Sequence, residues 1–156
     1  MIIEQKCLLP IPVERLWDFL IDAPTVSKCM PGIEGFSEAS PDEYEGRVRI
    51  KVGPISLRLQ GRVIVVERDR ERWTAKMKAE GGDQRIAGGV TAVLTLSLAP
   101  TERGETELNV VTNATVLGKL GEFGQPIMKK SADRIIQQFV QNVITALDES
   151  LRSAAL

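Results

Sequence analysis

The side chains that most often perform catalysis are scarce in this chain of 156 residues. It contains no histidine, so a Ser-His-Asp triad, a Cys-His pair or a histidine-ligated metal site cannot be built from it. Proton transfer would depend on carboxylates, on lysines or on Tyr44, the only tyrosine. Cys7 and Cys29 are too far apart for a CxxC redox or zinc motif. We expect no metal site, and two thiols that behave as small buried apolar groups, typical of a reducing, cytosolic compartment.

The carboxylates do not suggest an acid–base pair. Catalytic carboxylates are usually tuned by sharing an apolar pocket. The candidates in this chain fall instead at polar-face or helix-surface positions of the expected elements: Glu4, Glu14, Asp18, Glu105 and Glu107. The residues therefore favour a protein that is not an enzyme.

The charge is distributed unevenly along the chain, although the net charge is only -1. Residues 1–46 hold three basic and nine acidic side chains, whereas residues 47–85 hold eleven basic and five acidic ones. Such a basic stretch suits an anionic membrane surface or an acidic partner, and it also suits the solvated face of a sheet. Aromatic residues make up only 4%, which disfavours nucleic-acid binding. The candidate surface residues are Arg47, Arg49, Lys51, Arg58, Lys76 and Lys78.

The hydrophobic pattern predicts an α+β domain that spans residues 1–156. A strand is expected over about 2–9, then a helix from Pro12 to Leu20 with apolar residues at helical spacing, then a short helix over about 24–29. Alternation of apolar and polar residues then predicts six strands of an antiparallel meander, over about 33–39, 45–52, 55–65, 73–79, 90–98 and 108–116. The glycine pairs at 81–82 and 88–89 are expected to bracket a flexible loop.

The C-terminal part returns to helical spacing. From Ile127 to about Leu151 the apolar residues form one stripe of a long helix, about 36 Å at 1.5 Å per residue. The short helices and this stripe must bury against the inner face of a seven-stranded sheet. A sheet wrapped around one long helix encloses an elongated space, which is either filled by side chains or hollow.

Several expected inward positions are small, namely Gly61, Ala75, Ala79, Ala92 and Ala114. A filled core favours large side chains, so these positions either leave room for an apolar ligand or let the helix approach closely. The candidate ligand-binding set combines the inward strand residues with the start and inner stripe of the helix: Leu57, Leu59, Trp73, Ala75, Met77, Leu94, Leu96, Val110, Thr112, Phe123, Ile127, Met128, Ile135 and Phe139.

The order of elements is similar to the helix-grip fold of the Bet v 1/START-like (SRPBCC) superfamily. Within that superfamily the chain resembles the CoxG-like family, whose name refers to the G-subunit of carbon monoxide dehydrogenase. The resemblance covers residues 1 to about 150 and rests on PIPVERLWDFLID at 10–22, CMPG at 29–32, VGPI at 52–55, Gly88-Gly89, LGKLG at 117–121 and Phe139.

The resemblance implies an accessory protein without catalytic residues or a built-in cofactor. It would hold a lipid or an isoprenoid quinone and serve a molybdenum hydroxylase of the carbon-monoxide-dehydrogenase type, in the cytoplasm at the inner face of the membrane. Thr112 would donate to a quinone carbonyl or bond the backbone, and Phe123, expected to be exposed among glycines, would gate the entrance or belong to a plain connecting loop. The alternatives are a docking or assembly subunit with a filled core that acts through its basic sheet face, and, less favoured, a START-like enzyme.

Overall fold

One antiparallel sheet forms most of the computed structural model, which describes residues 1–155, with side chains described as far as Glu149. The strand order is β1-β7-β6-β5-β4-β3-β2, so the first and the last strand in sequence are neighbours and the sheet is not closed. The strands are β1 (Ile2–Leu9), β2 (Ile33–Ser40), β3 (Glu43–Val52), β4 (Ile55–Asp69), β5 (Thr74–Asp83), β6 (Gly88–Pro100) and β7 (Thr106–Leu117).

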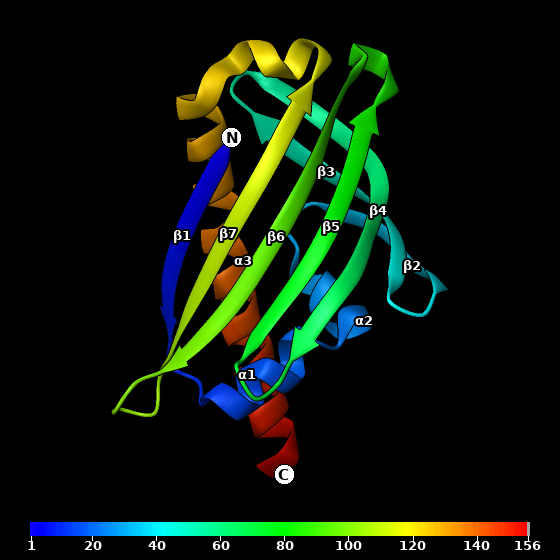
Figure 1. Ribbon diagram of the computed structural model, residues 1–156. Coiled ribbons are helices and arrows are strands. Elements are labelled where there is room, and N and C mark those ends of the chain that lie inside the picture. The colour runs from blue at the N-terminus through cyan, green and yellow to red at the C-terminus, as the bar shows by residue number, and fades with distance from the viewer. Residues whose placement is uncertain (156) are drawn as a thin grey trace.

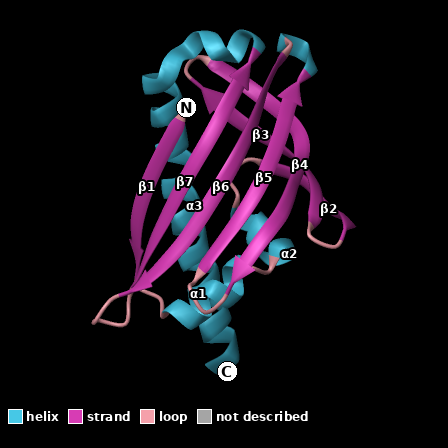
Figure 2. Cartoon of the chain, in the orientation of Figure 1, coloured by secondary structure: helices cyan, strands magenta, loops and turns pink. Residues whose placement is uncertain are grey.

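The helices lie on one side of this sheet and at its ends (Figure 1). Helix α1 (Val13–Leu20) follows Pro12, whose fixed φ suits a helix start, and it buries Val13, Leu16 and Trp17 on one face. Two short elements follow, α2 (Ala23–Val26) and the 3-10 turn η1 (Ser27–Cys29). The long helix α3 (Gly124–Ala155) crosses the inner face of the sheet, preceded by the 3-10 segment η3 (Gly118–Phe123); a third 3-10 turn, η2 (Gln84–Ile86), joins β5 to β6. This confirms the predicted helix-grip arrangement (Figure 2).

The strands are longer than predicted. The glycine pairs expected to bracket a loop lie inside strands, because Gly81 and Gly82 end β5 and Gly88 and Gly89 open β6, leaving only η2 between them. Strand β4 continues to Asp69, past its predicted end at about residue 65, with an irregularity in its pairing between Val65 and Glu67. The predicted second helix is divided between α2 and η1, and α3 begins three residues before Ile127.

Trp73 was predicted to open a strand, and this is wrong. It lies in the β4–β5 turn with a left-handed backbone (φ +54°), and β5 begins at the next residue. Its ring packs edge-on against Trp17, with 5.7 Å between centroids, and the guanidinium of Arg70 lies 5.5 Å above it. Period-two alternation cannot reveal such a turn, because the indole is buried by α1 rather than by the inner face of the sheet.

Helix α3 is attached to the two sides of the sheet by polar side chains. On the β1 side, Lys129 Nζ donates to the backbone oxygen of Glu4 at 3.4 Å, and Gln5 Nε2 donates to Asp133 at 3.0 Å. On the other side, Arg134 donates to the Lys51 carbonyl at 2.6 Å, and Asn142 donates to the Cys29 carbonyl at 2.9 Å. The backbone of α3 accordingly lies closer to β1 and β3 than to the central strands β4 to β7.

The buried side chains form two separate clusters. The larger one lies at the end of the sheet that α1 covers and joins α1 to β1, β6, β7 and the second half of α3, with Leu16, Trp17, Leu108 and Val143 among its most buried members. The smaller one lies at the opposite end and consists of Val52, Leu57 and Leu120 with partly buried neighbours. The two clusters leave the middle of the inner face between them.

Candidate functional site

The middle of the inner face carries small side chains in adjacent strands. The strand register places Gly46, Gly61 and Gly81 in one cross-strand row. The next row places Ala79, Ala92 and Ala114 side by side on β5, β6 and β7. We call these six residues the small-residue patch. Gly61 permits close strand approach. The alanines carry only short side chains on the inner face, where Ala79 and Ala92 are half-buried and Ala114 is buried.

Side chains around this patch remain partly exposed although they point toward the helix. Val63, Met77, Ala79 and Ala92 are half-buried, and none of them belongs to either core cluster. An inner-face residue keeps accessible surface only where the opposing element does not pack on it. These four residues therefore keep part of their surface accessible in the middle of the sheet.

The predicted ligand-binding residues fall into three groups. Trp73, Ala75, Leu94, Leu96, Val110 and Phe139 pack in or against the larger cluster, at the α1 end. Leu57, Leu59, Phe123 and Met128 belong to the smaller cluster, at the η3 end. Four residues belong to neither cluster: Met77, Thr112 and Ile135, which are half-buried, and Ile127, which is exposed. Thr112 stands opposite Leu94 on β6 and Ile3 on β1.

The segment predicted as an entrance is a 3-10 turn between two glycines with left-handed backbone, Gly118 (φ +68°) and Gly124 (φ +74°). Phe123 was expected to be exposed, but it is half-buried and packs near Gly53 in the β3–β4 turn. Ile127 packs near the same glycine while remaining 39% exposed. The connection therefore covers one end of the sheet instead of standing free as a loop.

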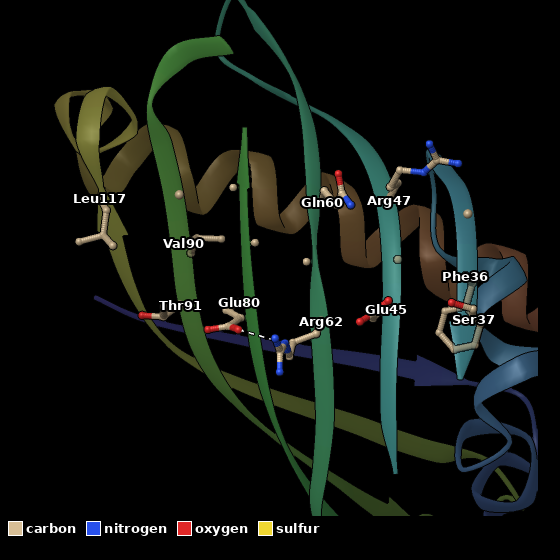
Figure 3. A pocket seen from close by; sticks show the side chains of 16 residues that line it. Phe36, Ser37, Glu45, Arg47, Gln60, Arg62, Glu80, Val90, Thr91 and Leu117 are labelled. Atoms are coloured by element: carbon tan, nitrogen blue, oxygen red, sulfur yellow. Dashed lines mark ion pairs between the residues drawn. The ribbon is translucent and has the colours of Figure 1, made fainter. Parts of the chain in front are cut away.

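A depression of about 620 Å³ lies on the outer face of the sheet, the side away from α3 (Figure 3). The outward positions Gly82 and Gly89 are neighbours across β5 and β6, so a bare backbone forms part of its floor. Glu80 pairs with Arg62 at 3.2 Å beside it, and Leu117 closes one side. Sequence reasoning missed this site, although alternation combined with the register would have placed both glycines outward. The apolar cavity predicted beneath the sheet stays a prediction.

The six predicted basic surface residues are all exposed but do not form one surface. Arg49 stands directly opposite Arg58, and Arg47 and Lys51 flank Arg49 on β3. Lys76 and Lys78 lie farther along, on β5. Between the two groups, Arg62 is paired with Glu43 at 3.1 Å and with Glu80. The charge on the central part of the outer face is therefore balanced.

Asp83 is the carboxyl group whose pKa departs most from its ordinary value. It lies at the end of β5 and is 4% exposed. Its carboxylate accepts hydrogen bonds from Arg85 Nη2 at 2.8 Å and from the backbone N–H of Arg58 at 2.9 Å. The Arg85 hydrogen bond, and then that of Arg58, hold the pKa of Asp83 well below its usual range. Asp83 thus ties β4 to the turn after β5, a structural role.

Asp83→Asn is expected to be less stable than the parent at neutral pH, with the difference shrinking below about pH 4. A carboxyl whose pKa is depressed on folding stabilises above its unfolded pKa of about 3.9, and this contribution is lost as the pH falls through the folded value. Urea midpoints measured from pH 7 to pH 3 test this. Glu102→Gln, an exposed position in the β6–β7 turn, should keep the parent's pH profile. A constant gap between Asp83→Asn and the parent would contradict the assignment.

The architecture is a known one, the helix-grip fold of Bet v 1/START-like proteins. A conserved protein from Geobacillus kaustophilus superposes with a TM-score of 0.87 at 22% identity, with 96% of this chain and 97% of that chain covered. A START superfamily protein from Mycobacterium smegmatis gives 0.70 at 13% identity, covering 95% and 97%. The Zhui aromatase/cyclase from Streptomyces sp. R1128 gives 0.69 at 13% identity, covering 99% and 97%. At these identities the likeness concerns the fold alone.

The sequence narrows this class to one family. Residues 9–148 match the family model of the carbon monoxide dehydrogenase G-subunit (CoxG). The chain therefore belongs to the CoxG family, as its sequence motifs predicted. No curated protein sequence matches the chain. Within the described residues, no helix is long and apolar enough to cross a membrane.

Proposed function

We propose that this protein is a non-catalytic carrier that holds an apolar small molecule between the middle of the sheet and α3. The ligand classes that fit are a lipid or an isoprenoid quinone, and the protein served would be a molybdenum hydroxylase of the carbon-monoxide-dehydrogenase type. Membership of the CoxG family supports the accessory role and the partner. Binding would rest on buried apolar area, at about 25 cal/mol per Å².

One observation carries this proposal: the core is divided, and the inner face between the two clusters is lined by small residues, of which Ala79 and Ala92 remain partly exposed. A protein selected only for stability would fill this space, because interiors normally pack as densely as organic crystals. Here polar side chains attach α3 at the two sides of the sheet, and the apolar residues of its second half belong to the larger cluster at the α1 end. These attachments would hold α3 in place over the sheet even if no side chains filled the space at the middle of the inner face.

The titratable groups support a role without catalysis. Burial raises the pKa of both Cys7 and Cys29, which makes them poor nucleophiles. Among the described residues, three carboxyl groups have a lowered pKa, each through a hydrogen bond with a basic side chain: Asp42 with Arg68, Asp83 with Arg85 and Asp133 with Lys129. Within the described residues, no group of three or more Cys, Asp or Glu side chains could hold a metal ion.

Native mass spectrometry of the purified protein tests the carrier directly. The expected result is a stoichiometric adduct that is released by organic extraction and identified as a lipid or a quinone. A bare mass that stays unchanged after incubation with membrane lipids and with a decyl-substituted benzoquinone would overturn the proposal. Adduct loss after mild delipidation, followed by uptake of the benzoquinone, would show that the site exchanges its ligand.

The alternative is a docking subunit that acts through its outer sheet face, and the depression beside Gly82 and Gly89 favours it. Glycine in a strand can mark a place where another chain approaches closely. However, close strand approach also explains both glycines, because a Cβ at Gly89 would lie 3.0 Å from the Gly81 carbonyl oxygen. The carrier therefore accounts for more of the structure.

A further inference from the structure

The two most exposed large apolar side chains among the described residues lie on one edge strand. Ile2 is 57% exposed and Leu8 is 56% exposed, and both belong to β1, which ends the strand order of the sheet (Figure 1). Glu4 and Lys6 lie between them and are also exposed, whereas Ile3 is buried. Alternation therefore places these four exposed side chains together on the outer face of β1, in the order apolar, acidic, basic, apolar.

The free edge of β1 also carries unpaired backbone groups. Met1 and Ala114 exchange two backbone hydrogen bonds, at 3.0 and 2.8 Å. Bonding to a neighbouring strand alternates along an antiparallel pair, so the odd-numbered residues of β1 bond to β7 and the even-numbered ones point their N–H and carbonyl groups away from the sheet. Among the described residues, no group bonds these outward groups of Lys6 and Leu8. The second half of this edge is therefore open to another strand.

Side chains of α3 cover the first half of the edge by two long hydrogen bonds. The carbonyl of Ile2 accepts from Gln125 and the carbonyl of Glu4 accepts from Lys129, each at 3.4 Å. Lys129 also donates to Asp133 at 2.6 Å, and that bond would remain if its ammonium group left the Glu4 carbonyl. Rotation of two side chains would therefore open the first half of the edge as well.

The other edge strand, β2, is less suited to pairing. Its register with β3 shifts twice within eight residues, between Ile33 and Gly35 and between Glu38 and Ser40. Such irregularities, together with exposed acidic side chains such as Glu34 and Glu38, protect a sheet edge from further pairing. Strand β1, in contrast, keeps one register with β7 along all eight of its residues, so its edge is regular.

We propose that the edge of β1 pairs antiparallel with β1 of a second copy of this chain, about a two-fold axis at Gln5. In this register Glu4 lies opposite Lys6 of the second copy, and Ile2 lies opposite its Leu8. Two-fold symmetry repeats each contact, so the outer side of the seam carries two ion pairs and two apolar pairs. The backbone groups match as well, because the even-numbered residues of the two strands face one another.

The charges select this register over its neighbours. Sliding one strand by two residues sets either Glu4 opposite Glu4 of the second copy or Lys6 opposite Lys6, and like charges directly opposite destabilise a sheet. Sliding it by one residue sets even-numbered residues opposite odd-numbered ones, which leaves the outward backbone groups without partners. The dimer would form one continuous sheet with both copies of α3 on the same side, and it does not depend on the proposed function.

Sedimentation equilibrium of the full chain tests this. The parent is expected to form a dimer whose population rises with concentration. Lys6→Glu sets acidic side chains opposite each other twice, and Glu4→Lys does the same with basic ones. Each should raise the dimer dissociation constant about thirtyfold. Lys78→Glu, which reverses an exposed charge on β5, should change it less than about twofold.

Mixing the two charge variants distinguishes this seam from any other interface. In a mixed dimer of the Glu4→Lys and Lys6→Glu chains every charge at the seam again faces its opposite, so equimolar mixing should restore association. The double variant Glu4→Lys/Lys6→Glu should also dimerise as the parent does. Failure of both to restore the dimer, or a parent that stays a single chain at every concentration, would overturn the proposal.

The apolar pairs have a matched control. Leu8→Ser should raise the dissociation constant about tenfold, because burial of the leucine is lost on both sides of the axis. Leu117→Ser removes an equally exposed leucine (54%) at the end of β7 that extends past β1, and it should leave association unchanged. Equal losses in the two serine variants would contradict pairing through β1. Ligand retention in native mass spectrometry does not enter these outcomes, so the dimer and the carrier can fail separately.

Discussion

Gly61→Ala is expected to lower the free energy of unfolding by at least about 3 kcal/mol, the upper range of overpacking costs. A Cβ at Gly61 would overlap the carbonyl oxygen of Glu80 and stand 2.6 Å from the Cα of Gly81. Both are backbone atoms of the paired strand β5, so no side-chain rotation relieves the overlap. The strands would have to separate in the middle of the sheet, which a urea titration would report as a lower midpoint.

The register supplies the matched control. Gly81 is the cross-strand partner of Gly61, yet a Cβ there would meet nothing nearer than the Gln60 oxygen at 3.6 Å, an ordinary contact. Gly81→Ala should therefore change stability by less than about 1 kcal/mol, with some gain from a less flexible unfolded chain. Equal destabilisation by both substitutions would show that the strands do not approach as closely at Gly61 as the structure has them.

Ala79→Phe is expected to abolish most ligand binding without destabilising the protein. The side chain would project from the small-residue patch into the space beneath α3, displacing two or more methylenes of a bound molecule. At about 0.8 kcal/mol for each buried CH₂, the dissociation constant for a decyl-substituted benzoquinone should rise about tenfold. Isothermal calorimetry or fluorescence quenching of Trp17 and Trp73 would measure it.

The same substitution distinguishes a hollow interior from a filled one. In a filled core the added ring would cost about 1–3 kcal/mol through overpacking, and the urea midpoint would fall. Thr95→Phe, at an exposed position on neighbouring strand β6, should alter neither binding nor stability. A marked loss of stability in Ala79→Phe alone would favour the docking subunit over the carrier.

The fold could be predicted because each helix and strand shows its hydrophobic periodicity within its own stretch of sequence. Alternation identified each strand, and the change of period at Ile127 identified α3, since the side-chain periods of strand and helix differ. Strand ends were less predictable: glycines at 81–82 and 88–89 usually break strands, but here they allow close pairing. Trp73 alternates with its neighbours yet lies in a turn, a difference that depends on contact with Trp17 from a distant helix.

The candidate site was only partly predictable for the same reason. Small inward residues such as Ala79 and Ala92 can be read from the sequence, but their position side by side depends on a register that no local pattern fixes. The register also places the Arg62–Glu80 pair between Lys76 and Lys78 on one side and Arg49 and Arg58 on the other. Likewise, the β3–β4 turn, the β5–β6 turn and η3 meet at one end of the sheet only after segments far apart in sequence have been brought together.

The pairing of β1 with β7 has a consequence for biosynthesis. Ile2 pairs with Asn113, and the N-terminal amino group of Met1 donates to the Ala114 carbonyl, so the first strand must wait for more than a hundred further residues. On a ribosome, β1 and its apolar residues would remain without a sheet partner while β2 to β6 emerge and pair in order. Pairing between strands so far apart in the sequence slows folding. It also leaves an unpaired, aggregation-prone strand edge in the nascent chain. The final assembly of this sheet is therefore the step at which a chaperone would have most to protect.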